Sequence, residues 1–340
     1  MEGEMMATKE NTQLCAEQTG AASAAPEANS GEKNKKNSFQ PAKLAPYLFC
    51  APFFITYCAF TLFSMVFTFF MSFMEWDGFG EMTFYGVENY KRFFDYSADP
   101  RFYQSLLNTV ILVVSTMPVG ILLALFLCFF LNGKAVQKKH FFRVLYYLPA
   151  LMTPVAVGLL WSILFDYENG TVNKFLMVFN LIEENIYWMG SGWGCRFVLS
   201  VLIIWSSFGS TVLFISSALA SVSESVVEAA TIDGSGPVST YVRICLPVIR
   251  DVMIFIIITG LISSFQMYDA PVLLFSSGPS GGLPYGGTER SCLTMVMLIM
   301  EEAFTNGHYG YASALSYGMF LVIGIFSFVS MKIMTRQEDM

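Results

Sequence analysis

Residues 228–247 read EAATIDGSGPVSTYVRICLP, a polar stretch with two glycines and two prolines. Long apolar blocks lie on both sides of it, at 197–220 and at 250–276. Polar connections between such blocks are typical of a membrane protein, because irregular backbone is placed outside the lipid. The stretch is therefore expected to be a structured loop between two membrane spans.

The composition also indicates a membrane protein. The 340 residues are 54% hydrophobic and only 13% charged, whereas soluble domains carry about 25% charged residues. One transmembrane helix needs about 20 apolar residues. We therefore predict an all-α polytopic membrane protein with about six transmembrane helices, in which Pro154 and Pro271 kink or end a helix. The apolar blocks lie at 44–73, 105–131, 142–165, 197–220, 250–276 and 310–334.

The first forty residues contrast with the rest of the chain. They are rich in Ala, Glu, Asn and Ser and contain no apolar stretch of the signal-peptide type. Such a composition buries too little surface to offset the entropy of ordering. Residues 1–40 are therefore expected to form a disordered cytoplasmic tail, and the first span an uncleaved anchor.

Basic residues predict the orientation, because cytoplasmic loops carry an excess of Lys and Arg. With the N-terminus inside, 13 of the 19 Lys and Arg residues fall on the inner side and 6 on the outer side. This assignment places both termini and the loops 132–143 and 221–249 in the cytoplasm. Segments 75–104, 166–196 and 277–309 then face outward.

The sequence carries no signature of catalysis. It has no Gly-x4-Gly-Lys-Ser/Thr phosphate loop, no Ser/His/Asp arrangement and no zinc-type spacing. The seven cysteines form no Cys-x-x-Cys pair, and neither His140 nor His308 has companion metal ligands. We therefore expect a protein that is not an enzyme, with no cofactor, no metal site and no nucleic-acid partner.

Cap signals predict how the loop at 221–249 begins. Ser221 and Glu224 fit a capping box, in which a hydroxyl and a carboxylate satisfy free N–H groups at the start of a helix. A short helix should run from there to about Asp233. A carboxylate at the negative end of its own helix is unfavourable, so Asp233 is expected to face the free amides of the next helix.

Glycine and proline predict how the loop continues. Gly234 stands where the chain leaves the first helix, a position that favours positive φ. Pro237 suits the first turn of a second short helix, and Pro247 marks the start of the next span. The expected shape is a helix, a glycine turn and a second helix on the cytoplasmic face.

Glu228 lies in the middle of the first short helix, beside Val226, Val227, Ala229 and Ala230. Small and apolar residues beside one carboxylate suit a helix that docks in a groove and pairs with a basic residue there. A solvated surface helix fits the same spacing equally well. The spacing alone therefore leaves both interpretations open.

A longer pattern connects this loop to a family. Glu228, Ala229, Ala230, Gly234, Ile244, Leu246 and Pro247 match the coupling loop of binding-protein-dependent ABC permeases with the same gaps. The resemblance implies an ABC type-1 (MetI-like) permease fold, with a first transmembrane helix and extracytoplasmic loop at 41–102 and the permease domain at 103–335. In that family the loop inserts into a cleft of a separate ATP-binding subunit. These residues, with Asp233, would then form the ATPase-coupling set.

Flanking segments narrow the resemblance. Residues 86–90, 99–102 and 105–109 resemble the periplasmic loop and second span of sugar permeases of the maltose and glycerol-3-phosphate type, first-permease subtype. Ser223 departs from the family, where proline is frequent, and so does the length of the N-terminal tail. The resemblance implies as partners a second permease subunit, an ATPase dimer and an extracytoplasmic solute-binding protein.

Polar residues inside the fourth and fifth spans are candidates for a substrate pathway. Gly260, Ser264 and Tyr268 are spaced i, i+4, i+8 and should share one helical face, while Gln266 and Asp269 lie nearer the outer mouth. Hydroxyls beside aromatic rings suit a sugar, although each serine also suits helix–helix packing. In the resembling permeases the pathway is drawn from these two stretches. The candidates are Trp205, Ser206, Ser207, Ser210, Gly260, Ser264, Gln266, Tyr268 and Asp269.

These observations favour one function. We expect a permease subunit of an ATP-driven ABC importer that moves a carbohydrate, an oligosaccharide or a glycoside, across the lipid bilayer of a bacterial cell membrane. A self-sufficient secondary transporter would predict midspan ionisable residues and an inverted repeat, and neither is evident. Two further functions stay open, an ABC permease for a non-sugar solute and a membrane enzyme or scaffold.

Overall fold

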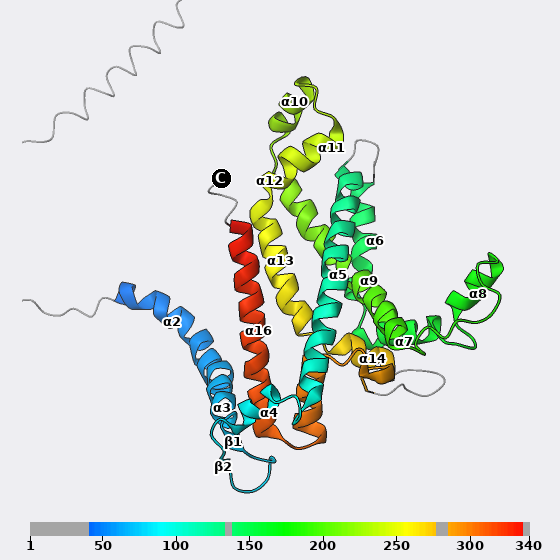
Figure 1. Cartoon of the computed structure of the whole chain (residues 1–340). Coiled ribbons are helices and arrows are strands. Elements are labelled where there is room, and N and C mark those ends of the chain that lie inside the picture. Colours follow the sequence, from blue (N-terminus) through cyan, green and yellow to red (C-terminus); the bar gives the residue numbers. More distant parts are fainter. Residues whose placement is uncertain (1–40, 133–137, 277–284, 336–340) are drawn as a thin grey trace, which may run out of the picture. The chain divides into compact units, whose positions relative to one another are not determined.

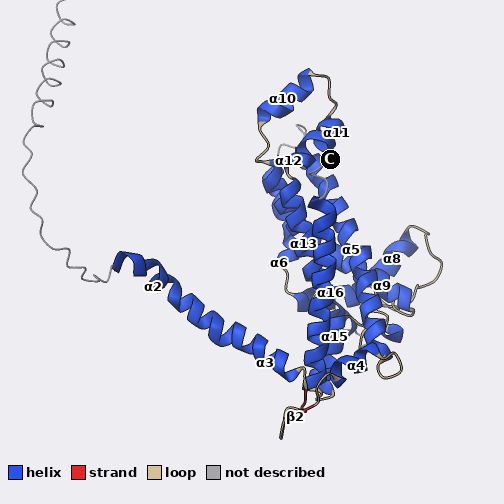
Figure 2. Cartoon of the chain, turned by 60° about the vertical axis from the view of Figure 1, so that its left-hand side comes forward, coloured by secondary structure: helices blue, strands red, loops and turns tan. Residues whose placement is uncertain are grey.

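The computed structural model describes residues 41–132, 138–276 and 285–335, most of which are helical (Figure 1, Figure 2). The chain divides into two compact units, Met1–Cys58 and Ala59–Met340. The described residues contain one small antiparallel sheet of two strands. The predicted all-α class is therefore confirmed.

The first unit contributes one described helix. This helix, α2 (Pro41–Thr56), is followed by the π-helical stretch η1 (Tyr57–Leu62), which runs across the boundary between the units, and by α3 (Phe63–Met71) in the second unit. The predicted cytoplasmic tail, residues 1–40, lies outside the described residues.

Membrane spans account for most of the helices. Four of the described helices are each long and apolar enough to cross a membrane. Two further pairs of these helices are long and apolar enough when each pair is counted as one span, and these pairs are bent by 91° and by 73°. The described part of the chain thus holds four to six candidate spans, in agreement with the prediction of about six. The four single spans are Tyr47–Met71, Pro100–Leu131, Gly192–Leu219 and Tyr309–Met334, and the pairs are Phe141–Leu151 with Pro154–Leu164 and Pro237–Val248 with Arg250–Phe265.

Proline causes the 91° bend. Helix α6 (Lys139–Leu151) stops before Pro154, which is the first residue of α7 (Pro154–Leu164). The Thr153 hydroxyl caps α7 by accepting a hydrogen bond from the N–H of Ala156, at 3.4 Å. A proline suits this first helical position because its missing N–H would be unpaired there anyway. The predicted effect of Pro154 is confirmed.

The predicted fifth span at 250–276 is wrong as a single helix. Helix α13 (Arg250–Phe265) ends and α14 (Asp269–Ser276) begins after a three-residue break. Pro271 explains the break, because it has no N–H to donate to the carbonyl group of Met267 and its ring would clash with that group.

The second unit is a bundle around two long helices. Helix α5 (Pro100–Asn132) packs along α9 (Gly192–Leu219), α6 also packs on α9, and α13 lies between α5 and α16 (Tyr309–Thr335). The approach of α6 to α9 depends on Gly209, where an added Cβ would collide with the carbonyl oxygen of Tyr146.

Short elements form the two ends of the second unit. They are β1 (Met74–Glu75), β2 (Thr83–Phe84), α4 (Glu88–Phe94), α8 (Thr171–Val178), α10 (Glu224–Ile232), α11 (Pro237–Thr240), η2 (Tyr241–Cys245), α12 (Leu246–Val248), η3 (Thr288–Arg290), α15 (Met295–Met300) and η4 (Glu301–Thr305). The C-terminal end of α16 lies at the same end as α10 to α12, and the β1–β2 hairpin and α4 lie at the other, here called the hairpin end (Figure 1). In the hairpin, Met74 pairs with Phe84.

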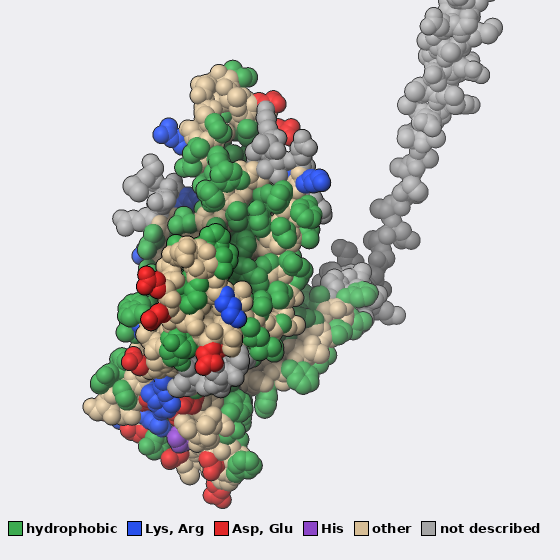
Figure 3. All heavy atoms as spheres, turned by 90° about the vertical axis from the view of Figure 1, so that its right-hand side faces the viewer, with side chains coloured by type: hydrophobic (Ala, Val, Ile, Leu, Met, Phe, Trp, Pro, Cys, Tyr) green, Lys and Arg blue, Asp and Glu red, His purple; other side chains and the backbone are tan. Residues whose placement is uncertain are grey.

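The flanks of the unit are apolar. Large side chains such as Leu122 and Phe126 in α5 and Phe320 in α16 are exposed. Hydrophobic side chains cover much of the flank seen in Figure 3, and charged side chains gather toward its lower end. Such a surface suits contact with lipid or with another membrane subunit.

A buried ion cluster joins distant segments at the hairpin end. The fully buried Glu302 accepts a hydrogen bond of 2.6 Å from Arg101 and lies 2.8 Å from Nδ1 of His308. Asp99 accepts hydrogen bonds from Arg101 and from the hydroxyl of Tyr311. Burial alone would raise the pKa of the Glu302 carboxyl, but the bonds from His308 and Arg101 outweigh burial and hold that pKa below its ordinary value.

Candidate functional site

The loop at 221–249 has the predicted helix–glycine–helix shape. Helix α10 ends at Ile232, and Gly234 has φ +83°. The N–H of Ser235 donates to the carbonyl of Ala230 at 2.9 Å, and the N–H of Gly234 donates to that of Thr231 at 3.1 Å. These two bonds are a Schellman motif, the usual way to satisfy the last carbonyls of a helix. The predicted turn at Gly234 is confirmed.

The predicted capping box is wrong. The hydroxyl of Ser221 donates to the carbonyl of Ala218 at 2.7 Å, so Ser221 completes the last turn of α9 rather than the first turn of α10. The residue before α10 is Ser223, which makes no side-chain cap bond to the helix. Its hydroxyl lies 2.7 Å from that of Ser225 instead.

The expected contact of Asp233 is also wrong. Asp233 is exposed at the end of α10, and no hydrogen bond to an α11 amide is found among these described residues. Pro237 is the first residue of α11, as predicted, and Gly236 precedes it. Pro247 lies inside α12, and α13 begins three residues later, so Pro247 stands close to the start of that helix.

The rest of the predicted coupling set divides between surface and core. Glu228 and Ala229 are exposed on α10, whereas Ala230 is buried. Exposed apolar side chains accompany Glu228, and Ile232 is 85% exposed. Ile244 and Leu246 are half-buried, and Leu246 packs against the bundle core. Helix α10 therefore presents a carboxylate and apolar groups together on its free surface.

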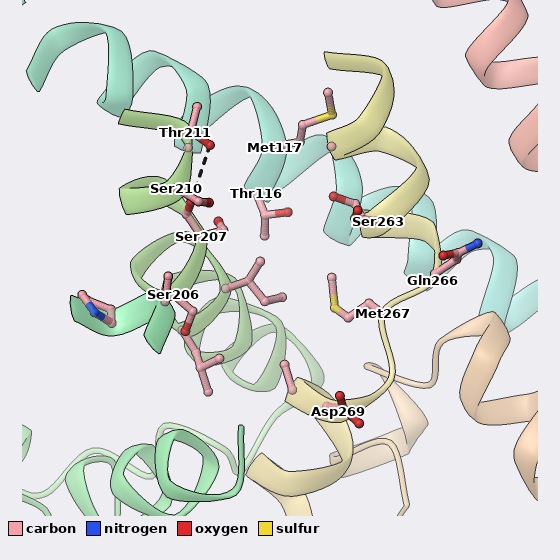
Figure 4. A pocket seen from close by; sticks show the side chains of 18 of the residues that line it. Thr116, Met117, Ser206, Ser207, Ser210, Thr211, Ser263, Gln266, Met267 and Asp269 are labelled. Atoms are coloured by element: carbon pink, nitrogen blue, oxygen red, sulfur yellow. Dashed lines mark hydrogen bonds between the residues drawn. The ribbon is translucent and has the colours of Figure 1, made fainter. Parts of the chain in front are cut away.

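A cavity of about 730 Å³ lies among α5, α7, α9, α13 and α14. Figure 4 shows the hydroxyl groups of α9 facing Ser263 and Met267 across it, with Asp269 on the opposite side from Thr211. Eight of the nine predicted pathway residues line this cavity. They are Ser206, Ser207, Ser210, Gly260, Ser264, Gln266, Tyr268 and Asp269.

Trp205 is the predicted pathway residue that does not line the cavity. It is half-buried in the core beside Trp161, with ring centroids 5.9 Å apart. The shared helical face of Gly260, Ser264 and Tyr268 is also wrong, because α13 ends before Tyr268. All three residues still reach the cavity, since the break between α13 and α14 folds Tyr268 toward it.

Hydrogen bonding leaves the cavity able to bind polar groups. The hydroxyls of Thr116 and Ser210 donate to carbonyls of their own helices, at 2.7 and 2.8 Å, and keep their acceptor sites. The Ser206 hydroxyl has no partner among the described residues. The Tyr268 side chain lies close to that of Tyr285, whose hydroxyl donates to the backbone carbonyl of Met297 at 3.1 Å.

Sequence reasoning missed several cavity residues. Thr116 of α5, Thr211 of α9 and Thr259 and Ser263 of α13 also line the cavity. Thr116 follows Ser115 in the second apolar block, so its hydroxyl was a polar signal of the same kind as those of the fourth and fifth blocks. Thr211 follows the predicted Ser210, and Ser263 precedes the predicted Ser264. Both could have been predicted from their place beside these polar residues.

Multiple spans, a structured loop at one end and a polar cavity between the helices define a membrane permease. The chain belongs to the family of binding-protein-dependent transport system inner membrane components, whose model matches residues 96–338. The protein is therefore a permease subunit of an inner membrane, and members of this family are transport subunits rather than enzymes, as predicted.

Individual relatives agree with the family. The chain is 30% identical to the probable ABC transporter permease protein YesP of Bacillus subtilis, over 88% of this chain and 93% of that protein. It is 28% identical to the arabinooligosaccharides transport system permease protein AraP of the same species, over 88% and 91%.

A solved structure supports the fold. It is the crystal structure of a bacterial alginate ABC transporter in complex with an alginate pentasaccharide-bound periplasmic protein. One of its chains matches with a TM-score of 0.73 at 19% identity, over 87% of this chain and 96% of that one. The predicted type-1 permease fold is therefore confirmed.

Proposed function

We propose that this permease subunit translocates a carbohydrate, an oligosaccharide or a glycoside, in an ATP-driven importer. The observation that carries the proposal is the cavity of about 730 Å³, whose lining combines serine and threonine hydroxyls with an amide and a carboxylate. Sugar hydroxyls both donate and accept hydrogen bonds, so such a lining can satisfy them. The transport of arabinooligosaccharides named for AraP supports the same class of solute.

The proposal includes three partners. A second permease subunit would complete the pathway, because this chain provides one coupling loop for a dimer of ATPases. A dimer of ATP-binding cassette ATPases would supply energy, since the chain has no phosphate-binding loop. An extracytoplasmic solute-binding protein would deliver the sugar, as the family description implies.

In this proposal the α10 end and both termini face the cytoplasm. The exposed carboxylate of Glu228 would pair with a basic group in a groove of the ATPase, and exposed apolar residues such as Ile232 would pack there. ATP-driven closure of the ATPase dimer would then move the loop. The cavity would open alternately to the outside and the inside, because the bundle follows the loop as a rigid body.

Reconstitution of the purified importer in proteoliposomes tests the proposal. A panel of radiolabelled oligosaccharides is offered with binding protein and internal ATP, and at least one should be taken up only when ATP is present. Ser264→Leu fills the cavity and removes a hydroxyl, so uptake should fall at least tenfold while the complex still assembles. Ser64→Leu is the matched control, because Ser64 is exposed in α3 and lies outside the cavity.

Three outcomes would contradict the proposal. ATP-dependent uptake of no saccharide, together with uptake of another solute class, would remove carbohydrate as the cargo. Ion-driven uptake by this chain alone would indicate a secondary transporter. Normal uptake by Ser264→Leu would remove the cavity as the pathway.

A further inference from the structure

The described lining of the cavity carries a negative charge and no positive charge. Among the described lining residues, Asp269 is the only one with a formal charge at neutral pH. The lining residues lie within 116–121, 149–158, 202–214 and 255–270. The sequence has no Lys, Arg or His within these four ranges or within four residues of either end of any of them, and the nearest are Arg143, Arg196 and Arg250. The described contribution of this subunit to the cavity is therefore neutral or negative.

Asp269 is free to meet a ligand. It is the first residue of α14, where a carboxylate is favoured by the helix dipole. Its side chain is exposed, and no hydrogen bond or ion pair holds it among the described residues. Figure 4 shows its carboxylate at the edge of the cavity, across from the hydroxyls of α9.

A carboxylate solute would enter this cavity at a disadvantage. An ion that leaves water for a membrane cavity loses several kcal/mol of solvation unless an opposite charge compensates it. This subunit offers hydroxyls and one like charge instead, and like charges brought together cost further energy. A neutral sugar loses less solvation, and its hydroxyls can donate to the Asp269 carboxylate in a charge-assisted hydrogen bond.

We propose that the cavity selects uncharged saccharides over uronate-containing ones, and that Asp269 makes the selection by accepting hydrogen bonds from sugar hydroxyls and repelling carboxylates. The proposal rests on the carbohydrate function proposed above. It adds a substrate class and a specificity residue, and it predicts at least a tenfold preference for a neutral over an acidic oligosaccharide of equal length.

The test measures binding to the assembled importer in nanodiscs, without binding protein, so that the permease cavity alone discriminates. The probes are radiolabelled arabinotriose and tri-galacturonate. Wild-type complex should bind arabinotriose at least tenfold more tightly. Asp269→Asn should weaken arabinotriose binding severalfold and so reduce the ratio of the affinity for arabinotriose to that for tri-galacturonate. Asp269→Lys should bind tri-galacturonate at least tenfold more tightly than the wild type does.

Glu183→Gln is the control, because Glu183 is an exposed carboxylate outside the cavity and its loss should leave the ratio unchanged. Equal affinity of the wild type for both probes would overturn the proposal, as would an unchanged ratio in Asp269→Asn. Failure to bind arabinotriose in a complex that imports oligosaccharides would overturn it as well. Absence of any saccharide uptake would instead reject the carbohydrate function itself.

Discussion

The hydroxyl of Tyr241 donates a hydrogen bond to the backbone carbonyl oxygen of Leu125, at 3.0 Å. Tyr241 begins η2, in the second half of the loop at 221–249, and Leu125 lies in α5. One turn along α5, Ile121 lines the cavity. The ring of Tyr241 also packs edge-on against Phe129, with centroids 5.3 Å apart. The loop is therefore tied directly to a helix that forms the cavity wall.

Tyr241→Phe should weaken the link between ATP hydrolysis and transport. The substitution removes one hydrogen bond, worth about 1 kcal/mol, and keeps the ring packing. A coupling free energy of about that size corresponds to roughly fivefold. The ratio of ATP hydrolysed to sugar taken up should thus rise by about fivefold or less, with expression and assembly unchanged. Parallel phosphate-release and uptake assays in proteoliposomes measure it.

Tyr167→Phe is the matched control for this experiment. Tyr167 is 47% exposed and far in sequence from the loop, and no hydrogen bond of its hydroxyl is found in the described structure, so its loss should leave the ratio as it was. An unchanged ratio in Tyr241→Phe as well would mean that the loop moves the bundle through packing alone.

The contrast between Gly234 and Ser221 illustrates what sequence can predict. Positive φ is a property of a single residue and its turn, so Gly234 was predicted correctly. The role of Ser221 depended on where α9 ends, and helix ends are set by tertiary packing as much as by local signals. Breaks at proline are only partly predictable. Pro271 indicates that the helix is interrupted, but the direction of the chain after the break could not be predicted from the sequence.

The ion cluster at the hairpin end lay beyond prediction for another reason. Arg101 and Glu302 are 201 residues apart in sequence, and neither belongs to a motif that indicates the other. The cavity was easier to predict, because Ser206, Ser264 and Asp269 are polar residues in apolar blocks, where such residues need a partner or a cavity. Trp205, which belongs to the same stretch, instead faces the core.

Glu228→Lys should abolish transport without unfolding the subunit. Glu228 is exposed on α10, and no hydrogen bond or ion pair of its carboxylate is found within the described ranges. If this carboxylate pairs with a basic group of the ATPase, reversing the charge replaces attraction by repulsion, which costs several kcal/mol at an interface. Uptake and sugar-stimulated ATP hydrolysis should both fall at least tenfold, and co-purification of the ATPase should weaken.

Glu224→Lys distinguishes position from net charge. Glu224 is exposed in the first turn of the same helix, and its reversal should cost at most about 1 kcal/mol through the helix dipole. Equal loss of transport in both variants would show that total charge matters and would contradict a specific role of Glu228.

Gly234→Ala should destabilise the turn at the C-terminal end of α10. An added Cβ meets nothing within 4 Å, so the cost comes from the backbone alone at φ +83°. A left-handed conformation costs about 1–2 kcal/mol for a residue with a Cβ. The Schellman bonds should therefore open more often, which hydrogen exchange would detect as faster exchange of the Ser235 amide. Gly236→Ala is the control, since Gly236 has φ −72° and equally open space, and no such acceleration is expected there.

The buried carboxylate of Glu302 makes the hairpin end sensitive to acid. Its pKa is lower in the folded protein than its ordinary value of 4.5, because burial is outweighed by the bonds from His308 and Arg101. A carboxyl with a depressed pKa adds stability above its ordinary pKa, and this stability is lost as the pH falls through the folded value. Arg92 also lies 3.9 Å away, which reinforces the effect.

Glu302→Gln should destabilise the hairpin end at neutral pH and reduce its sensitivity to acid. Loss of the charge leaves Arg101 short of a partner, and the cost should stay below the roughly 3–5 kcal/mol typical of a fully buried pair, because Arg101 is 28% exposed. Thermal unfolding between pH 7 and pH 3 measures this acid sensitivity. The unfolding temperature of the wild type should drop once the pH is below about 4.5. The variant should unfold at a lower temperature at pH 7, and its unfolding temperature should drop less in acid. Glu88→Gln, in an exposed pair with Lys91, should keep the wild-type profile. Parallel profiles for Glu302→Gln and wild type would mean that the acid response arises from other carboxylates.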